Sequence, residues 1–152
     1  MSPDAIEPDA IEEAARFIAR NRLLAHRLPR LDDAIRPRTP DDGYAVQDRV
    51  TALLGAAGRG HPAGYKIGLT TKVMQEFMNI HEPAYAPVLE PLVFREYLRH
   101  THAETVEPGV ETEIAVTMAG DLPAGDAPFT RDSVADAVAS VHASIEMVDA
   151  RY

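Results

Sequence analysis

The sequence predicts an α+β fold in which helices come first and strands enter later. Apolar residues recur at helical spacing within residues 1–60, whereas strand-like alternation is clearest at Val110–Met118. No internal repeat, low-complexity tract or linker interrupts the chain. Helical elements followed by mixed strands favour an α+β arrangement. We therefore expect an N-terminal helical region at 1–60 and a sheet-containing region at 61–152.

Two helices are expected in the first region. Asp9-Ala10-Ile11-Glu12 has the spacing of a capping box, and an apolar stripe follows at Ile11, Ala14, Ala15 and Ile18. Thr39-Pro40-Asp41-Asp42 combines a cap residue, a proline at the first helical position and acids in the first turn. Apolar residues continue from this start at Val46, Val50, Leu53 and Leu54. Glycines and Pro62 within 55–64 predict a loop, without the residue order of a phosphate-binding loop.

Shorter elements are expected in the second region. A strand is predicted at Tyr65–Leu69, a helix at Thr71–Met78, and an extended segment around prolines 83, 87 and 91. Further strands are predicted at Leu92–Tyr97, Val110–Met118 and Ile145–Tyr152. Thr130 or Asp132 would cap a helix carrying Val134, Val138, Val141 and His142. The last strand stops without a turn, cap or polar tail, and we interpret the chain as a fragment or as one completed by another polypeptide.

Composition excludes several classes of protein. The net charge of −9 argues against a nucleic-acid or anionic-membrane partner. Absence of cysteine excludes disulfides and a thiolate zinc site. No apolar run approaches the ~20 residues of a membrane span, and the acidic N-terminus lacks the features of a signal peptide. The simplest location is the cytoplasm.

Three glutamates form the main candidate site. Side chains alternate along a strand, so Glu111 and Glu113 project to one face, about 6.5–7 Å apart, while Val110, Ile114, Val116 and Met118 form the expected core face. Glu146 lies within another apolar run, and a third carboxylate from a neighbouring strand would complete an oxygen site suited to Mg²⁺ or Mn²⁺. A solvated acidic face remains the alternative. His100 and His102 have strand spacing that also suits zinc, against a default of solvated loop histidines.

Several segments resemble a known enzyme family. Gly64-Tyr65-Lys66-Ile67-Gly68-Leu69-Thr70-Thr71-Lys72-Val73-Met74-Gln75 is similar to a block of the 2-keto-4-pentenoate hydratases, which belong to the fumarylacetoacetate hydrolase superfamily. The resemblance continues in order through the segments 80–83, 110–115, 120–123 and 145–151, and it also covers 42–47. Only the N-terminal part of the family is matched. The resemblance implies N-terminal helices followed by an incomplete part of a mixed β-roll.

The resemblance also implies a chemistry. Glu111, Glu113 and Glu146 match the family's ligands for a divalent metal, Mg²⁺ or Mn²⁺, and Lys66 matches its active-site lysine. His81 is a weaker candidate for contact with the substrate. The implied reaction is a hydro-lyase step: hydration of 2-hydroxy-2,4-dienoates to 4-hydroxy-2-oxo acids in catabolism of aromatic compounds. Without the resemblance, Lys66 is interpreted as a lysine whose stem packs on Tyr65.

The sequence departs from the family pattern at two positions, and other functions are alternatives to hydration. Ala84 stands where the family has an acid near the substrate, and Gly109 stands where an arginine is common. A 2-oxo-3-enoate decarboxylase or an acylpyruvate-type hydrolase would use a similar metal-bound 2-oxo acid. A non-catalytic or half-site subunit, completed by another chain, is the alternative of a different class. Because exposed strand edges favour association, we expect an oligomer or a complementing chain.

Overall fold

The structure of the chain is a computed structural model that describes residues 5–151. The chain divides into two compact units, Met1–Glu104 with Arg151–Tyr152, and Thr105–Ala150. Each unit is a mixture of helix and sheet, which agrees with the predicted α+β class. None of the helices within the described range is long and apolar enough to cross a membrane.

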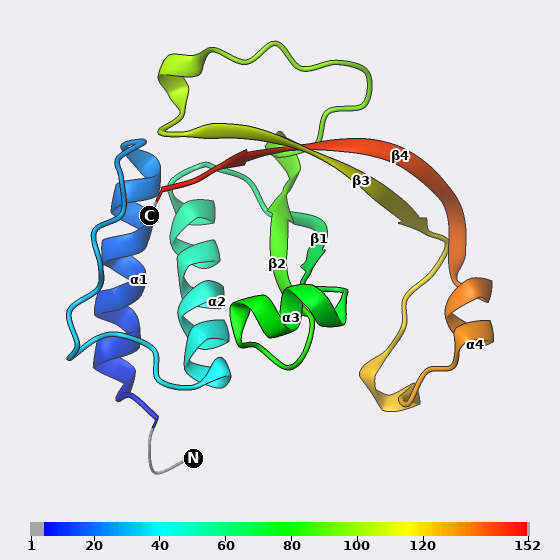
Figure 1. The fold of residues 1–152 in the computed structure, drawn as a ribbon, viewed down its shortest axis with the longest axis horizontal. Coiled ribbons are helices and arrows are strands. Elements are labelled where there is room, and N and C mark those ends of the chain that lie inside the picture. Colours follow the sequence, from blue (N-terminus) through cyan, green and yellow to red (C-terminus); the bar gives the residue numbers. More distant parts are fainter. Residues whose placement is uncertain (1–4, 152) are drawn as a thin grey trace. The chain divides into compact units, whose positions relative to one another are not determined.

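Two helices form the core of the first unit. Helix α1 (Pro8–Leu23) and helix α2 (Pro40–Ala56) lie side by side, and the connecting segment returns along α1 so that both run the same way (Figure 1). Small side chains on α1 let the backbones approach closely, and larger apolar side chains fill the remaining space. The buried core consists of Ala14, Ala15, Ala19, Ile35, Val46, Val50, Leu54 and Leu89. Full burial of each large aliphatic side chain stabilises the fold by about 1.5–3 kcal/mol.

The predicted start of α2 is confirmed. Thr39 Oγ1 accepts a hydrogen bond from the Asp42 backbone N–H at 3.1 Å, and Asp42 Oδ2 accepts one from the Thr39 N–H at 3.0 Å. Asp42 also accepts from the N–H groups of Arg38 at 3.0 Å and Ile6 at 3.3 Å. Burial acts to raise the pKa of Asp42, but these backbone donors outweigh it and the pKa is lowered. The predicted capping box at Asp9 is wrong, because α1 begins at Pro8 and Asp9 falls inside its first turn.

An ion-pair cluster joins the two helices. Glu12 of α1 accepts hydrogen bonds from Arg49 of α2, one of them 3.1 Å long from Nη2, and also from Arg16 one turn along α1. The hydrogen bond from Arg49 is the main cause that lowers the pKa of Glu12 from 4.5 to about 2. The cluster therefore ties α1 to α2 at every pH where Glu12 is ionised.

The rest of the first unit is a two-stranded hairpin with a short helix. Strand β1 (Pro62–Gly68) pairs antiparallel with β2 (Ala84–Leu89), and α3 (Lys72–Met78) lies between them in sequence with Thr71 as its cap. Tyr85 of β2 stacks on Tyr44 of α2 with ring centroids 4.5 Å apart, and Tyr65 of β1 meets Tyr85 edge-on at 5.9 Å. These aromatic contacts join the hairpin to α2.

One predicted strand of this unit is wrong. Residues 92–97 form no strand: a 3₁₀ helix, η1 (Glu90–Leu92), is followed by irregular chain, and a second 3₁₀ helix, η2 (His102–Glu104), ends the segment. Pro91 occupies η1, and its missing N–H and fixed φ angle suit a tight turn better than a ladder. The apolar residues from Val93 to Tyr97 therefore lacked the partner strand that their β-propensity requires.

The second unit is a long antiparallel hairpin. Strand β3 (Pro108–Met118) pairs with β4 (Val138–Asp149), and between them lie a 3₁₀ helix, η3 (Ala124–Asp126), and α4 (Arg131–Asp136). Thr130 caps α4 in a capping box with Ser133, as the sequence predicted for Thr130. The helix nevertheless ends at Asp136, so the prediction that it carries Val138, Val141 and His142 is wrong. These residues lie in β4, where pairing with the long strand β3 overrides the local helical spacing.

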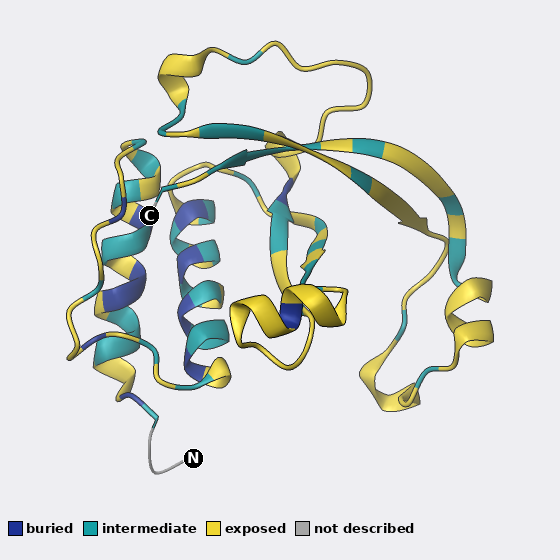
Figure 2. Cartoon of the chain, in the orientation of Figure 1, coloured by how far each residue is buried: buried dark blue, intermediate teal, exposed yellow. Residues whose placement is uncertain are grey.

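One face of this hairpin is apolar and exposed. Val110 and Ile114 of β3 are 73% and 75% exposed, and Ile145 of β4 is 73% exposed. Figure 2 shows β3 as largely exposed along its length. The prediction that Val110, Ile114, Val116 and Met118 point away from the glutamates is confirmed by the strand alternation, but their predicted place in a core is wrong in this chain.

Candidate metal centre

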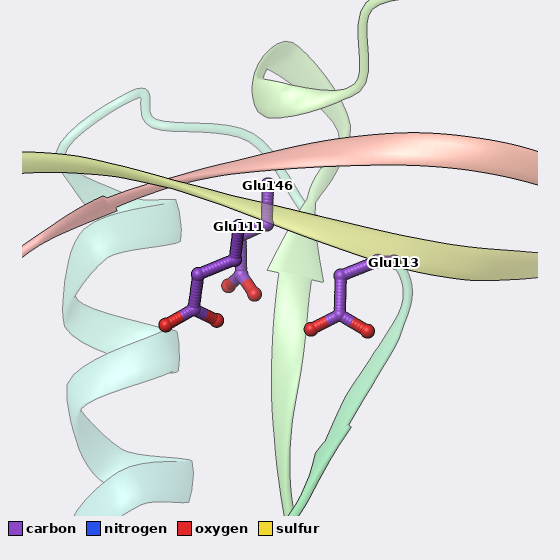
Figure 3. A group of neighbouring side chains, drawn as sticks. All are labelled: Glu111, Glu113 and Glu146. Carbon is purple, nitrogen blue, oxygen red and sulfur yellow. The ribbon is translucent and has the colours of Figure 1, made fainter.

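The register of β3 and β4 brings the three glutamates together. Glu111 lies directly opposite Glu146, and Glu113 lies opposite Ser144, one step diagonally from Glu146. Side chains that face one another in this way, and those on the adjacent diagonal, project from the same face of the ladder. Figure 3 shows the three carboxyl groups extending from the same side of the two strands. One carboxylate oxygen from each residue lies within 4.8 Å of the other two.

This spacing fits a divalent cation. Mg²⁺ holds oxygens at about 2.0–2.1 Å in an octahedron, so adjacent ligand oxygens are about 3 Å apart and opposite ones about 4 Å apart. The separations in the cluster are therefore within about 2 Å of those in a coordination shell, a distance that rotation of glutamate side chains can close. The donor set is composed of hard oxygen ligands, which Mg²⁺, Mn²⁺ and Ca²⁺ prefer. Glu111 is exposed and the other two are half-buried, so the cluster is open to solvent on one side.

Repulsion among the three carboxylates also favours a bound cation. Like charges placed directly opposite each other in an antiparallel ladder destabilise it. Glu111 and Glu146 occupy such a pair, and Glu113 adds a third negative charge to the same face. A bound dication would offset most of this repulsion. In the described part of the chain, this is the one group of three potential ligands with atoms close enough to share an ion.

Lys66 and His81 lie in the other compact unit. Lys66 is half-buried in β1 opposite Ala86, and Tyr65 and Ile67 project from the other face of the strand. The interpretation in which the Lys66 stem packs on Tyr65 is therefore disfavoured, since adjacent residues of a strand face opposite ways. His81 is exposed in the loop between α3 and β2. The roles of both residues stay predictions.

The strand spacing expected for His100 and His102 is wrong. His102 begins η2, and His100 lies in irregular chain with Nδ1 at 3.8 Å from Glu104 Oε2. Because neither residue is in a strand, their separation by one residue does not place both rings on one face, which removes the argument for zinc.

Three further polar residues lie on the glutamate face, and the sequence did not predict them there. Ser140 Oγ lies 2.8 Å from His142 Nε2, and Thr117 Oγ1 lies 3.3 Å from the same nitrogen. The misplaced helix covered Ser140 and His142, whereas Thr117 lies in the predicted strand Val110–Met118, on the same face as Glu111 and Glu113. The signal that was available is the alternation of polar residues at 140, 142, 144 and 146, which is the pattern of a strand face.

Comparison with known proteins identifies the relatives of the chain. No family model matches it. It is 30% identical to 2-keto-4-pentenoate hydratase from Paraburkholderia xenovorans over 150 residues, which are 95% of this chain and 52% of that protein. It is 34% identical to 2-oxo-hept-4-ene-1,7-dioate hydratase from Escherichia coli over 113 residues, 74% of this chain and 41% of that protein. The chain is a relative of the 2-keto-4-pentenoate hydratases. The resemblance found in the sequence is confirmed.

The fold has a solved counterpart. The structure matches 4-oxalocrotonate decarboxylase from Pseudomonas putida G7, in complex with calcium and acetate, with a TM-score of 0.83 and 23% identity. The match covers 97% of this chain and 56% of the decarboxylase. The chain thus spans about half the length of the hydratases and of the decarboxylase that it matches.

Proposed function

We propose that this chain carries the metal-binding part of a hydro-lyase that hydrates 2-hydroxy-2,4-dienoates to 4-hydroxy-2-oxo acids. The observation that carries the proposal is the cluster of Glu111, Glu113 and Glu146, with one oxygen of each within 4.8 Å of the others. The relatives named as hydratases of related acids support the reaction class.

The three glutamates would hold Mg²⁺ or Mn²⁺. When bound, the cation supplies positive charge that stabilises the developing enolate oxygen of a 2-oxo acid. The part played by the protein is to fix the position of the ion. Glu111 and Glu113 come from one strand and Glu146 from its partner, so the ladder hydrogen bonds of β3 and β4 hold the three ligands in register. The complexes of the decarboxylase with calcium and with magnesium support a divalent ion here.

Lys66 is proposed as the second functional group. Its ammonium would neutralise the carboxylate of the substrate or relay a proton to it. Lys66 is half-buried in β1. His81 is proposed as a contact to the substrate from its loop. Ala84 begins β2 opposite Gly68 and has no acid–base group, so the proton chemistry has to use other residues.

The direct test is to follow the ultraviolet absorbance of 2-hydroxypenta-2,4-dienoate with the purified chain, first with Mg²⁺ and then with EDTA. We expect loss of the dienol band that stops when EDTA is added, with 4-hydroxy-2-oxopentanoate as the product. Turnover that continues unchanged in EDTA would contradict the proposal.

A decarboxylase or hydrolase acting on a similar 2-oxo acid is the second candidate. The observation that favours it is the structural match to 4-oxalocrotonate decarboxylase. These activities differ from hydration in what attacks or leaves. Release of CO₂ or of a carboxylic acid fragment from a 2-oxo acid substrate would establish the second candidate instead of the first.

A half-site subunit is a further candidate, supported by the exposed apolar face of the β3–β4 hairpin. Side chains such as Val110, Ile114 and Ile145 are more than 70% exposed, and contiguous apolar surface of this kind marks an interaction surface. We propose that the two hairpins are parts of a mixed β-roll that further polypeptide completes. Size-exclusion chromatography of the chain alone and with a complementing chain tests this, since only the mixture would be both stable and active.

A further inference from the structure

The glutamate face of the β3–β4 hairpin extends beyond the metal centre. Thr117 lies opposite Ser140, and His142 lies opposite Ala115, so the hydroxyl groups and the imidazole share one face. Both hydroxyl oxygens contact Nε2 of His142, at 2.8 Å from Ser140 and 3.3 Å from Thr117. Thr117 and His142 are exposed, and Ser140 is half-buried. We call Thr117, Ser140 and His142 the hydroxyl–imidazole group; none of them has a role in the proposed hydration.

The register sets the distance between this group and the metal centre. Ser140, His142, Ser144 and Glu146 alternate along β4 and therefore project to one side. Ser144 is the cross-strand partner of Glu113, and His142 lies one alternate position further along. Alternate residues are about 6.5–7 Å apart along a strand. His142 therefore lies about 7 Å along the face from the level of Glu113.

The hydroxyl–imidazole group offers hydrogen-bond donors. A neutral imidazole whose Nε2 accepts a hydrogen bond from one hydroxyl group has its proton on Nδ1, and Nδ1–H is then a donor. Within residues 5–151, no hydrogen bond is formed by Nδ1 of His142. Ser140 makes the shorter contact with Nε2, so the O–H of Thr117 can supply a second donor. Two donors on an open surface are suited to the two oxygens of a carboxylate.

We propose that the hydroxyl–imidazole group binds a second carboxylate of the substrate, so that the preferred substrates are 2-oxo or 2-hydroxy-dienoic acids that are dioates. This inference rests on the proposed function, in which the metal centre holds the 2-oxo acid head. Three bonds of an extended chain reach about 3.3–3.6 Å, so the five carbon–carbon bonds of a six-carbon dioate reach about 6 Å. The centre of the three glutamates lies between the levels of Glu111 and Glu113, so His142 is about 10–12 Å from it along the face. A carbon chain of about 6 Å spans that distance when a metal–oxygen contact of about 2 Å at one end and a hydrogen bond of about 3 Å at the other are added. The charged side chains of β3 and β4 on this face are those of Glu111, Glu113 and Glu146, which repel a second carboxylate.

The test compares two 2-oxo acids of equal length by isothermal titration calorimetry with the Mg²⁺-loaded chain. 2-Oxoadipate has a second carboxylate, and 2-oxohexanoate has a methyl group in its place. We expect 2-oxoadipate to bind about tenfold more tightly, the size of effect expected for hydrogen bonds to a charged group. His142→Leu should bring the ratio of the two affinities to about one and leave the affinity for 2-oxohexanoate unchanged.

Matched variants separate recognition from folding. His142→Gln keeps an N–H donor and should restore part of the preference for 2-oxoadipate. Thr117→Val should reduce the preference, whereas Thr112→Val removes an exposed hydroxyl from the opposite face of the same strand and should not alter it. Equal affinity for the two acids in the unaltered chain, or a preference that survives His142→Leu, would overturn this inference and leave the proposed function standing. If neither acid binds in an Mg²⁺-dependent manner, the proposed function fails and the inference fails with it.

Discussion

Glu111 and Glu146 are direct cross-strand partners in the β3–β4 ladder. Like charges directly opposite each other destabilise a ladder, and cross-strand pairs typically contribute about 0.2–1 kcal/mol. We expect Glu111→Gln to raise the melting temperature of the chain in EDTA and to remove the additional rise caused by Mg²⁺. Thermal unfolding with and without Mg²⁺ measures both effects. A variant that is destabilised in EDTA would contradict the repulsion argued from the register.

Replacing Glu113 tests the candidate metal centre and leaves Glu111 opposite Glu146. A ligand that binds only the folded state raises its stability by about 2.7 kcal/mol at a concentration one hundred times its Kd. Glu113→Gln should abolish this Mg²⁺-dependent stabilisation. Asp121→Asn, with the same change in charge, should retain it. Unchanged protection in Glu113→Gln would show that the cluster is a solvated acidic face.

Lys66→Ala separates a role in catalysis from a role in metal binding. Lys66 lies in β1, and the three glutamates lie in β3 and β4, so its removal should leave the Mg²⁺-induced shift in melting temperature intact. Turnover of the dienoate should fall by about 10²-fold or more, as is typical when a positioned acid–base group is removed. Lys72→Ala, which removes the other lysine of the chain, is the matched control. Loss of folding in Lys66→Ala alone would favour a structural role for Lys66.

The Glu12–Arg49 ion pair predicts how stability depends on pH. The pKa of Glu12 is lowered in the folded chain from 4.5 to about 2, mainly by the hydrogen bond from Arg49. A lowered pKa means that the contribution to stability is fully present above pH 4.5 and is lost as the pH falls from there through about 2. Glu12→Gln should therefore lower the melting temperature at neutral pH. The difference from the unaltered chain should shrink as the pH falls through that window; a difference independent of pH would contradict the prediction.

Gly109 of β3 lies close to its cross-strand partner on β4. A Cβ atom at Gly109 would lie 2.9 Å from Cγ2 of Val148, its cross-strand partner. Relieving such overlap typically costs about 1–3 kcal/mol, so Gly109→Ala should destabilise the chain by that order. Gly109→Ala combined with Val148→Ala should be less destabilised than the sum of the two single changes. Urea denaturation of the four proteins measures the coupling, and strict additivity would contradict it.

Local chemistry explains which elements the sequence predicted correctly. The cap at Thr39 and the stripe of Val46, Val50 and Leu54 depend on hydrogen bonds and spacing within one helix, and both are confirmed. The strand at Glu111 and Glu113 follows from alternation along one segment. Placing both carboxylates on one face needed no knowledge of the partner strand. The resemblance to the hydratases was likewise a property of the order of residues.

Only the tertiary structure decided which strand pairs with which, and in what register. Residues 138–142 have helical spacing after a helix cap, but their pairing with β3 makes them a strand and brings His142 to the glutamate face. Residues 92–97 have strand propensity but no partner strand, and they form no strand. The position of Glu146 opposite Glu111, which brings three separate acids together as a candidate metal centre, is a consequence of register. Hydrogen bonds between segments distant in sequence determine that register, and no local pattern encodes them.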